Sequence, residues 1–373
     1  MGVRSLVKKP VELWWRYEQH LRVLGLATGF VFDLIIADRP DSPINNLILL
    51  SYLVMAGGLI IVLNIKSARR WDVETGYQPL FLLFVLQFCF GGLASNLLVL
   101  YGRSGTFAAS TLFFLLLLGM VIGNEFLRNR YAQLRFNIVT YYTLLLTYLL
   151  VALPTFLFHS VDTWVFLASG AVSLVTIGLF LGAVYWLVLR GRQREKQFYE
   201  VSVLVGLVFL FFNGLYFLNI IPPVPLSLKN IGMYHSIERL ASPAGGAASI
   251  YSATYEEPPW FVFWRATNST YTLHASSAAV CFSSVFAPAK LTAPIFHRWE
   301  KYDEDKNKWV QVSRISFAIS GGRDGGFRGF TNFTVTPGRW RCNVETQNGA
   351  LIGRTTVTVV ESTTPPELAQ TRL

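Results

Sequence analysis

Six stretches of the chain lack Asp, Glu, Lys and Arg and are long enough to cross a bilayer as helices. They cover residues 46–65, 78–102, 104–124, 136–161, 163–189 and 201–228. A membrane-spanning helix needs about 20 apolar residues, so each stretch predicts one span. A shorter apolar run, residues 23–37, contains Asp33 and predicts a seventh span. After residue 228 no long apolar run recurs, and apolar and polar positions alternate.

Basic residues are distributed unevenly between the predicted spans. The N-terminal segment and every second connection carry 15 Lys and Arg residues, whereas the other side carries only Arg39 and Arg103. Cytoplasmic loops are enriched in Lys and Arg, so this pattern predicts a cytoplasmic N-terminus. With seven spans, the region after residue 221 lies outside the cytoplasm. Six spans would place the basic N-terminal segment outside, against this rule, which favours counting the run that contains Asp33.

The predicted membrane domain covers residues 21–221 and follows a leader, residues 1–20, that we expect to lie at the membrane interface. Asp33 either reaches the outer headgroups from a helix end or serves an intramembrane site. Gln87 and Asn96 are the other polar candidates within the spans. With six spans free of charge, the membrane half resembles an anchor more than a coupled transporter, which normally needs several buried charges. A transporter or lipid-handling protein with the outer region as a lid remains the alternative.

Beyond the last span, the chain predicts a connector over residues 222–248, in which Lys229–Leu240 has the spacing of a short amphipathic helix. Residues 249–362 predict an all-β domain, and 363–373 a disordered tail. The candidate strands of the all-β domain are 249–254, 260–265, 270–274, 277–285, 294–302, 308–319, 327–335, 339–346 and 351–360. Short, regularly spaced strands separated by turn residues are typical of an antiparallel, immunoglobulin-like sandwich.

Cys281 and Cys342 both fall in the predicted β domain, with Trp299 between them in the sequence. This order is typical of an immunoglobulin-like domain, where a Trp packs against a disulfide that joins two sheets. An extracytoplasmic compartment would permit the bond. Two small buried residues on separate strands are the alternative.

Overall composition fits the membrane interpretation. Only 14% of residues are charged and 52% are hydrophobic, whereas soluble domains carry about 25% charged residues. These values exclude a disordered chain, a coiled coil and an ordinary soluble enzyme. The net charge of +10 would suggest a nucleic-acid partner in a soluble protein. Here cytoplasmic loops account for much of it, and the outer domain has no basic stripe, so we expect no nucleic-acid partner.

The outer region contains five motifs in sequence order. They are Val285-Phe-Ala-Pro, Ile295-Phe-His-Arg-Trp, Gly321-Gly-Arg-Asp-Gly-Gly-Phe-Arg, Gly338-Arg-Trp-Arg and Asn348-Gly-Ala-Leu-Ile-Gly. In these motifs and their order, roughly residues 280–360 resemble a bacterial family known as domain of unknown function 2914. The resemblance implies a bacterial β domain outside a multi-span anchor, and it implies no activity.

The polar and aromatic residues within those motifs are the candidate binding site. They are His297, Trp299, Arg323, Arg328, Trp340 and Arg341. Arg323 and Arg328 flank a glycine loop and, with aromatic rings beside them, would suit an anion or an acidic carbohydrate. The alternative is structural: both Trp residues in the core, His297 bonded to a carbonyl and the arginines bracing the turn.

Enzymatic signals are weak in this sequence. The histidines of the outer region lack metal-ligand spacing, and no cofactor or phosphate-loop fingerprint occurs. We therefore expect a non-enzymatic protein of the bacterial inner membrane, without metal or cofactor. Its periplasmic sandwich would bind an envelope protein or glycan in a scaffold or assembly role. A sensor that acts through a separate effector chain is a weaker alternative.

Overall fold

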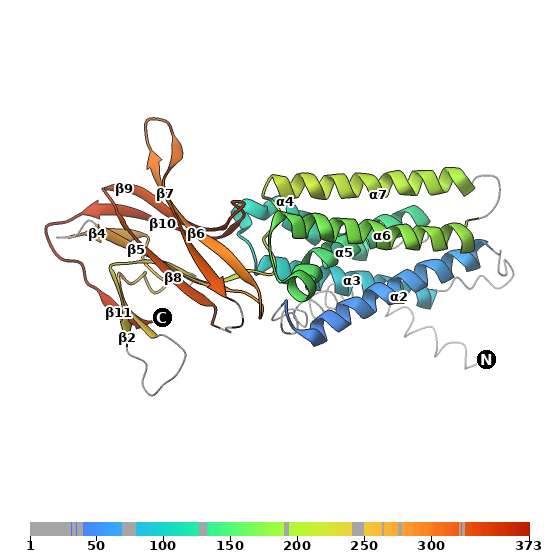
Figure 1. Cartoon of the computed structure of the whole chain (residues 1–373), viewed down its shortest axis with the longest axis horizontal. Helices are drawn as coiled ribbons and strands as arrows, with labels where there is room; N and C mark the ends of the chain where they lie inside the picture. Colours follow the sequence, from blue (N-terminus) through green and yellow to red (C-terminus); the bar gives the residue numbers. More distant parts are fainter. Residues whose placement is uncertain are drawn as a thin grey trace, which may run out of the picture. The chain divides into compact units, whose positions relative to one another are not determined.

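A computed structural model of the protein describes residues 31, 35, 40–68, 80–126, 133–189, 194–240, 250–262, 265–274, 278–320, 322 and 325–373. The chain divides into two compact units (Figure 1). The first contains Met1–Tyr101, Leu112–Ala152 and Ala168–Gly214, and the second contains Gly102–Thr111, Leu153–Leu167 and Leu215–Leu373.

The described residues before 218 form six α-helices. These are α2 (Pro43–Ala68), α3 (Leu80–Gly102), α4 (Phe107–Phe126), α5 (Leu134–Leu153), α6 (Thr163–Leu187) and α7 (Arg194–Phe217). A π-helical turn, Pro154–Phe158, extends α5 at the proline. Five of the six are long and apolar enough to cross a membrane, and α4 holds a shorter apolar segment, Ala109–Gly123. The expected spans thus correspond to helices, although α7 begins and ends earlier than expected.

The expected first span and the leader lie almost wholly outside the described residues. Of residues 23–37 only Val31 and Ile35 are described, and both are helical. Of the seven predicted helices, the described part of the chain therefore contains six with defined bounds and two helical residues of the first, and Asp33 is outside it.

The remainder of the described chain is all-β and contains eleven strands. They are β1 (Ser227–Tyr234), β2 (Ser236–Leu240), β3 (Ile250–Tyr255), β4 (Thr270–Leu273), β5 (Ala278–Phe286), β6 (Thr292–Asp303), β7 (Lys308–Ser320), β8 (Phe327–Thr334), β9 (Gly338–Thr346), β10 (Leu351–Glu361) and β11 (Ala369–Arg372). Eight of the nine predicted strands are present. The exception is 260–265, whose described residues are not in a strand.

Three sheets share these strands, in the orders β1-β5-β8, β4-β10-β9-β6-β7 and β11-β3-β2. All pairs are antiparallel except β10 with β4. A buried cluster contains residues of the first two of these sheets, among them Met233 and Cys281 from the three-stranded sheet β1-β5-β8 and Trp299, Trp340 and Cys342 from the five-stranded sheet. The burial of apolar side chains on the inward positions of both sheets supplies the main stabilisation of this region.

Two predictions for the ends of the β region are wrong. Lys229–Leu240 is not a helix, because its residues form most of β1 and β2; β1 pairs with β5, about fifty residues further along the chain. Residues 363–373 are not a disordered tail, because Ala369–Arg372 form β11 and pair with Ser252–Tyr255. In both segments, hydrogen bonds to distant strands decide the conformation, and local spacing does not contain that information.

Candidate functional site

His297 and Trp299 lie on the inward side of β6 and are fully buried. The Thr331 hydroxyl on β8 lies 2.9 Å from Nδ1 of His297 and accepts a hydrogen bond from Nε1 of Trp299 at 3.1 Å. The other ring nitrogen of His297 lies 2.7 Å from the Ser283 hydroxyl. Burial lowers the pKa of His297 to about 3. The ring is therefore a neutral, fully bonded part of the core, without access to a ligand.

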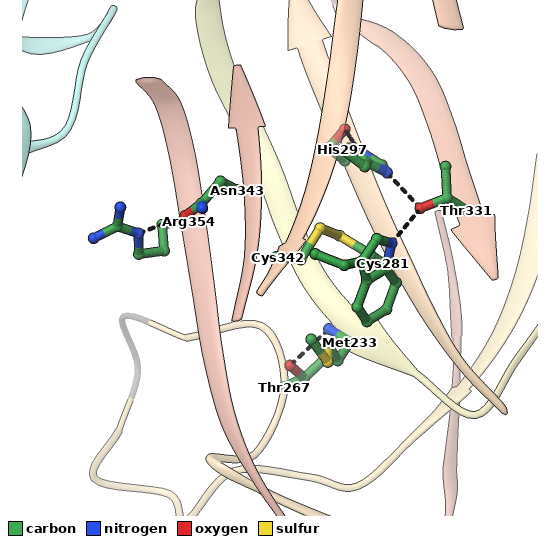
Figure 2. The surroundings of a disulfide bond; sticks show 10 residues. Met233, Thr267, Cys281, His297, Thr331, Cys342, Asn343 and Arg354 are labelled. Carbon is green, nitrogen blue, oxygen red and sulfur yellow. Dashed lines mark hydrogen bonds between the residues drawn. A yellow bond between two sulfur atoms is a disulfide. The ribbon is translucent and has the colours of Figure 1, made fainter. Parts of the chain in front are cut away.

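Cys281 on β5 and Cys342 on β9 form a disulfide, which links the sheet β1-β5-β8 to the five-stranded sheet (Figure 2). Trp299 and Trp340 belong to the same buried cluster. Nε1 of Trp340 donates to the carbonyl of Thr336 at 2.7 Å. The two sulfur atoms and a His297 nitrogen lie within 4.8 Å of one another. Because both sulfurs are committed to the disulfide, they do not offer thiolate ligands to a metal in this state.

The remaining candidates are spread over the molecule. Arg328 is half-buried on β8, and Arg323 lies outside the described residues. In the helices, the buried amide of Asn96 exchanges two hydrogen bonds with Asn45, at 2.8 and 3.3 Å. Gln87 is half-buried in α3. Gln87 and Asn96 belong to the first compact unit, and the described candidates of the β region belong to the second.

Arg341 points away from the buried cluster, since side chains alternate across a strand and its neighbours Trp340 and Cys342 point inward. It belongs to a row of outward side chains on four adjacent strands. We call the arginines of this row the arginine face: Arg298 on β6, Arg314 on β7, Arg339 and Arg341 on β9, and Arg354 on β10. The strand register places Arg298 opposite both Arg314 and Asn343.

Glu300 is one of two buried carboxylates on the arginine face. Its side chain is only 7% exposed and forms an ion pair with Arg341, and Asn343 donates to it at 2.6 Å. Burial alone would raise the pKa of Glu300, but the hydrogen bonds from Arg341 and Asn343 and the charges of Arg298 and Arg341 outweigh it and hold the pKa below its usual range. Glu300 is therefore ionised and fully engaged in this network.

Glu345 is the second buried carboxylate, with a side chain only 2% exposed. Nε of Arg298 lies 3.0 Å from one of its oxygens, and Nε of Arg314 donates to the other at 2.8 Å. Arg314 also donates to the carbonyls of Thr346 and Gln347. The two arginines thus hold the carboxylate from neighbouring strands.

Arg354 extends the network to β10. Its Nε donates to Oδ1 of Asn343 at 2.6 Å, and Figure 2 shows this pair on the side of β9 away from the disulfide. Burial, followed by the positive charge of Arg341, lowers the pKa of Arg354. The arginine face holds five guanidinium groups and, among its described neighbours, two carboxylates, which leaves an excess of positive charge.

Aromatic rings support three of the guanidinium groups. Arg341 lies over the ring of Trp309 at 4.3 Å, Arg314 over Phe296 at 3.8 Å, and Arg339 over Tyr302 at 4.3 Å. Stacking of this kind orients a planar guanidinium and leaves N–H groups at its edge available. A sheet surface with oriented, partly exposed cations suits the recognition of carboxylate or phosphate groups.

The sequence identified Arg341 but missed the other members of the arginine face. The pattern that could have revealed them is visible in the sequence. Arg298 and Glu300 lie two positions apart on one strand, and Arg339, Arg341, Asn343 and Glu345 occupy every second position of another. In both strands they lie on the side opposite to the buried residues. What the sequence could not supply was the register that brings these two alternating sets together.

Residues 292–359 match a family model described as "Protein of unknown function (DUF2914)", as the motifs predicted. The match covers every residue of the arginine face. No curated protein matches the sequence.

Two solved structures show weak similarity. The β-glucosidase from Listeria innocua in complex with isofagomine has 12% identity and a TM-score of 0.20, and the match covers 31% of this chain and 17% of that one. The Pseudomonas fluorescens alkylpurine DNA glycosylase AlkC, bound to DNA containing an abasic site analog, has 10% identity and a TM-score of 0.19 over 86% of this chain and 99% of that one. At these TM-scores neither structure informs the fold or function of this chain.

Proposed function

We propose that this chain is a non-enzymatic, membrane-anchored binding protein of the bacterial inner membrane. Its β region, an immunoglobulin-like sandwich on the periplasmic side, holds an anionic polymer of the cell envelope on the arginine face. The observation that carries the proposal is the gathering of five guanidinium groups around two carboxylates that are already paired.

The electrostatics of the face favour an anionic ligand. Glu300 and Glu345 are buried under the arginine side chains and neutralise part of the positive charge of the arginine face. Arg298 and Arg314 remain 28% and 31% exposed, and Arg339 is exposed. A polymer with repeated carboxylate or phosphate groups can contact several of these cations at once, which multiplies modest single contacts into useful affinity.

The same network argues against catalysis on this face. A general acid at neutral pH needs a carboxyl group with a raised pKa, whereas the pKa of Glu300 is lowered. The membrane anchor is supported by five helices of sufficient length and apolarity. The periplasmic side is supported by the excess of basic residues in alternate loops and by the disulfide.

The test is a binding measurement on the full chain in nanodiscs, with fluorescently labelled polygalacturonate as the acidic glycan. We expect the wild-type protein to bind more weakly as salt rises. The double variant Arg314→Gln/Arg339→Gln should bind about tenfold more weakly, a loss of about 1.4 kcal/mol. Arg372→Gln/Lys290→Gln removes two charges from outside the arginine face and is the matched control. A non-reducing gel checks the disulfide of each variant.

Two outcomes would contradict the proposal. If the test and control variants bind polygalacturonate equally weakly, binding depends only on the net charge of the protein. Tight binding of poly-glutamate, with no binding of the glycan, would replace the polymer by an acidic protein as the partner.

A further inference from the structure

A second cationic feature lies in a pocket of about 450 Å³ within the second unit. Three of its lining residues are positively charged: Arg103, Lys229 and Arg354. Among the described residues, no carboxylate lines it. Like charges repel at short range, so an anion bound between these three side chains would lower their mutual repulsion.

The hydroxyl groups of the pocket add hydrogen-bonding capacity. Thr106 and Ser227 both line it. Thr106 directly precedes α4, and its carbonyl accepts from the backbone N–H groups of Ala109 and Ser110 at 3.1 and 3.0 Å. The Thr106 hydroxyl is buried and finds no hydrogen-bond partner among the described residues. A helix-capping Thr normally bonds a backbone N–H of the first turn, so this hydroxyl is available to a ligand.

The described lining of the pocket thus combines three cations with an orphaned hydroxyl, and both favour an anion of compact shape.

We propose that this pocket binds a phosphate group. Arg103 follows directly on α3, a helix of membrane-spanning length and composition that ends at Gly102. The phosphate of an anionic phospholipid headgroup is therefore one source, and soluble inorganic phosphate is the other. Either would contact Arg103, Lys229 and Arg354. The pocket shares Arg354 with the arginine face, but Arg103 and Lys229 belong to the pocket alone, so variants of these two residues test it separately from polymer binding.

The test uses the full chain with the double variant Arg103→Gln/Lys229→Gln. In the first arm, native mass spectrometry measures retention of phosphatidylglycerol against phosphatidylcholine after extraction from mixed vesicles. In the second arm, calorimetry measures inorganic phosphate binding in phosphatidylcholine nanodiscs. We expect the variant to bind the phosphate-bearing ligand about tenfold more weakly than the wild type does, because charge-assisted hydrogen bonds are lost.

Lys306→Gln/Lys308→Gln removes the same charge from exposed positions on the β6–β7 hairpin and is the matched control. Arg103→Lys restores a cation and should recover part of the affinity, which also shows that Arg103 variants fold. A loss of phosphatidylglycerol identifies the lipid as the source, and a loss confined to inorganic phosphate identifies the soluble anion. If neither ligand binds more weakly to the double variant than to the control, the proposal is wrong. Polygalacturonate binding should be unaffected by this variant, so the failure of either proposal is recognised separately.

Discussion

His297 makes the stability of the β region depend on pH. The pKa of the buried ring is about 3, whereas an exposed histidine titrates near 6.5. Below pH 6.5 the unfolded chain therefore takes up a proton that the folded chain does not. We predict that the free energy of unfolding around β6 falls with decreasing pH, by at most about 1.4 kcal/mol per pH unit.

The measurement is hydrogen exchange of β6 peptides in the full chain, corrected for intrinsic rates, between pH 7 and pH 5. This window lies above the usual range of carboxyl groups, so Glu300 contributes little to it. His297→Gln should remove most of the slope, because glutamine does not titrate. His274→Gln, at an exposed histidine, is the control. A slope that persists in His297→Gln would show that another group is responsible.

Gly329 on β8 is required for close packing against β7. A Cβ at this position would overlap the ring of Phe317. We predict that Gly329→Ala destabilises the β region by about 1–3 kcal/mol, the usual cost of overpacking. The double variant Gly329→Ala/Phe317→Leu should be more stable than Gly329→Ala, as measured by urea unfolding of the full chain in micelles. Without that recovery, steric overlap is not the cause.

Individual residues also show which properties of the β region could be predicted from the sequence. Cys281 and Cys342 could be paired by analogy, because the order Cys, Trp, Cys is visible in the chain. Glu300 and Glu345 could not be recognised as buried. A carboxylate in a strand usually indicates a solvated position, and their burial depends on arginines that adjacent strands supply through the register.

At the scale of elements, a pair of asparagines joins α2 and α3. Asn45 and Asn96 are both buried and bond to each other reciprocally. Removal of one partner leaves the other amide unsatisfied in an apolar environment. We predict that Asn96→Ala lowers the thermal stability of the full chain in detergent, and that Asn45→Ala/Asn96→Ala costs less than the sum of the single variants. A coupling energy of about 0.5–2 kcal/mol is expected. Strict additivity would contradict it.

Strand β11 covers one edge of β3 in the sheet β11-β3-β2. It pairs with β3, and Leu373 packs against the buried cluster of Tyr234, Ala253, Val280 and Phe282. We predict that deletion of residues 367–373 accelerates hydrogen exchange in β3 by about tenfold, because β3 loses hydrogen bonds and apolar contact. Arg372→Gln keeps both and should exchange as the wild type does. Unchanged exchange after the deletion would mean that β11 does not stabilise β3.

The elements differ in how well local pattern specifies them. The apolar stretches predicted helices because a bilayer-length run allows few other solutions. Lys229–Leu240 carries apolar residues at a spacing compatible with a helix, yet β1 forms because β5 offers a complementary edge. That edge is visible only once the fold is known, so the helix prediction failed where non-local pairing decided the outcome.

At the scale of the whole molecule, the charge distribution makes a topological prediction. Basic residues gather in alternate loops of the helical half, and this bias orients membrane proteins. The disulfide between Cys281 and Cys342 needs an oxidising compartment to persist. These two observations are independent, since one depends on the loops and the other on the β region. Together they favour an extracytoplasmic β region.

Reporter fusions test this prediction in living bacteria. Alkaline phosphatase becomes active only outside the cytoplasm. Green fluorescent protein fluoresces only within it, because it does not fold correctly after export in the unfolded state. We expect fusions after Leu373 to give active phosphatase and no fluorescence, and fusions after Lys196, at the basic end of α7, to give the reverse. On a non-reducing gel, Cys342→Ser should change the mobility of the full chain, because the bond closes a loop of 61 residues. Fluorescence at Leu373, with phosphatase activity at Lys196, would invert the topology and remove the envelope polymer from the reach of the arginine face.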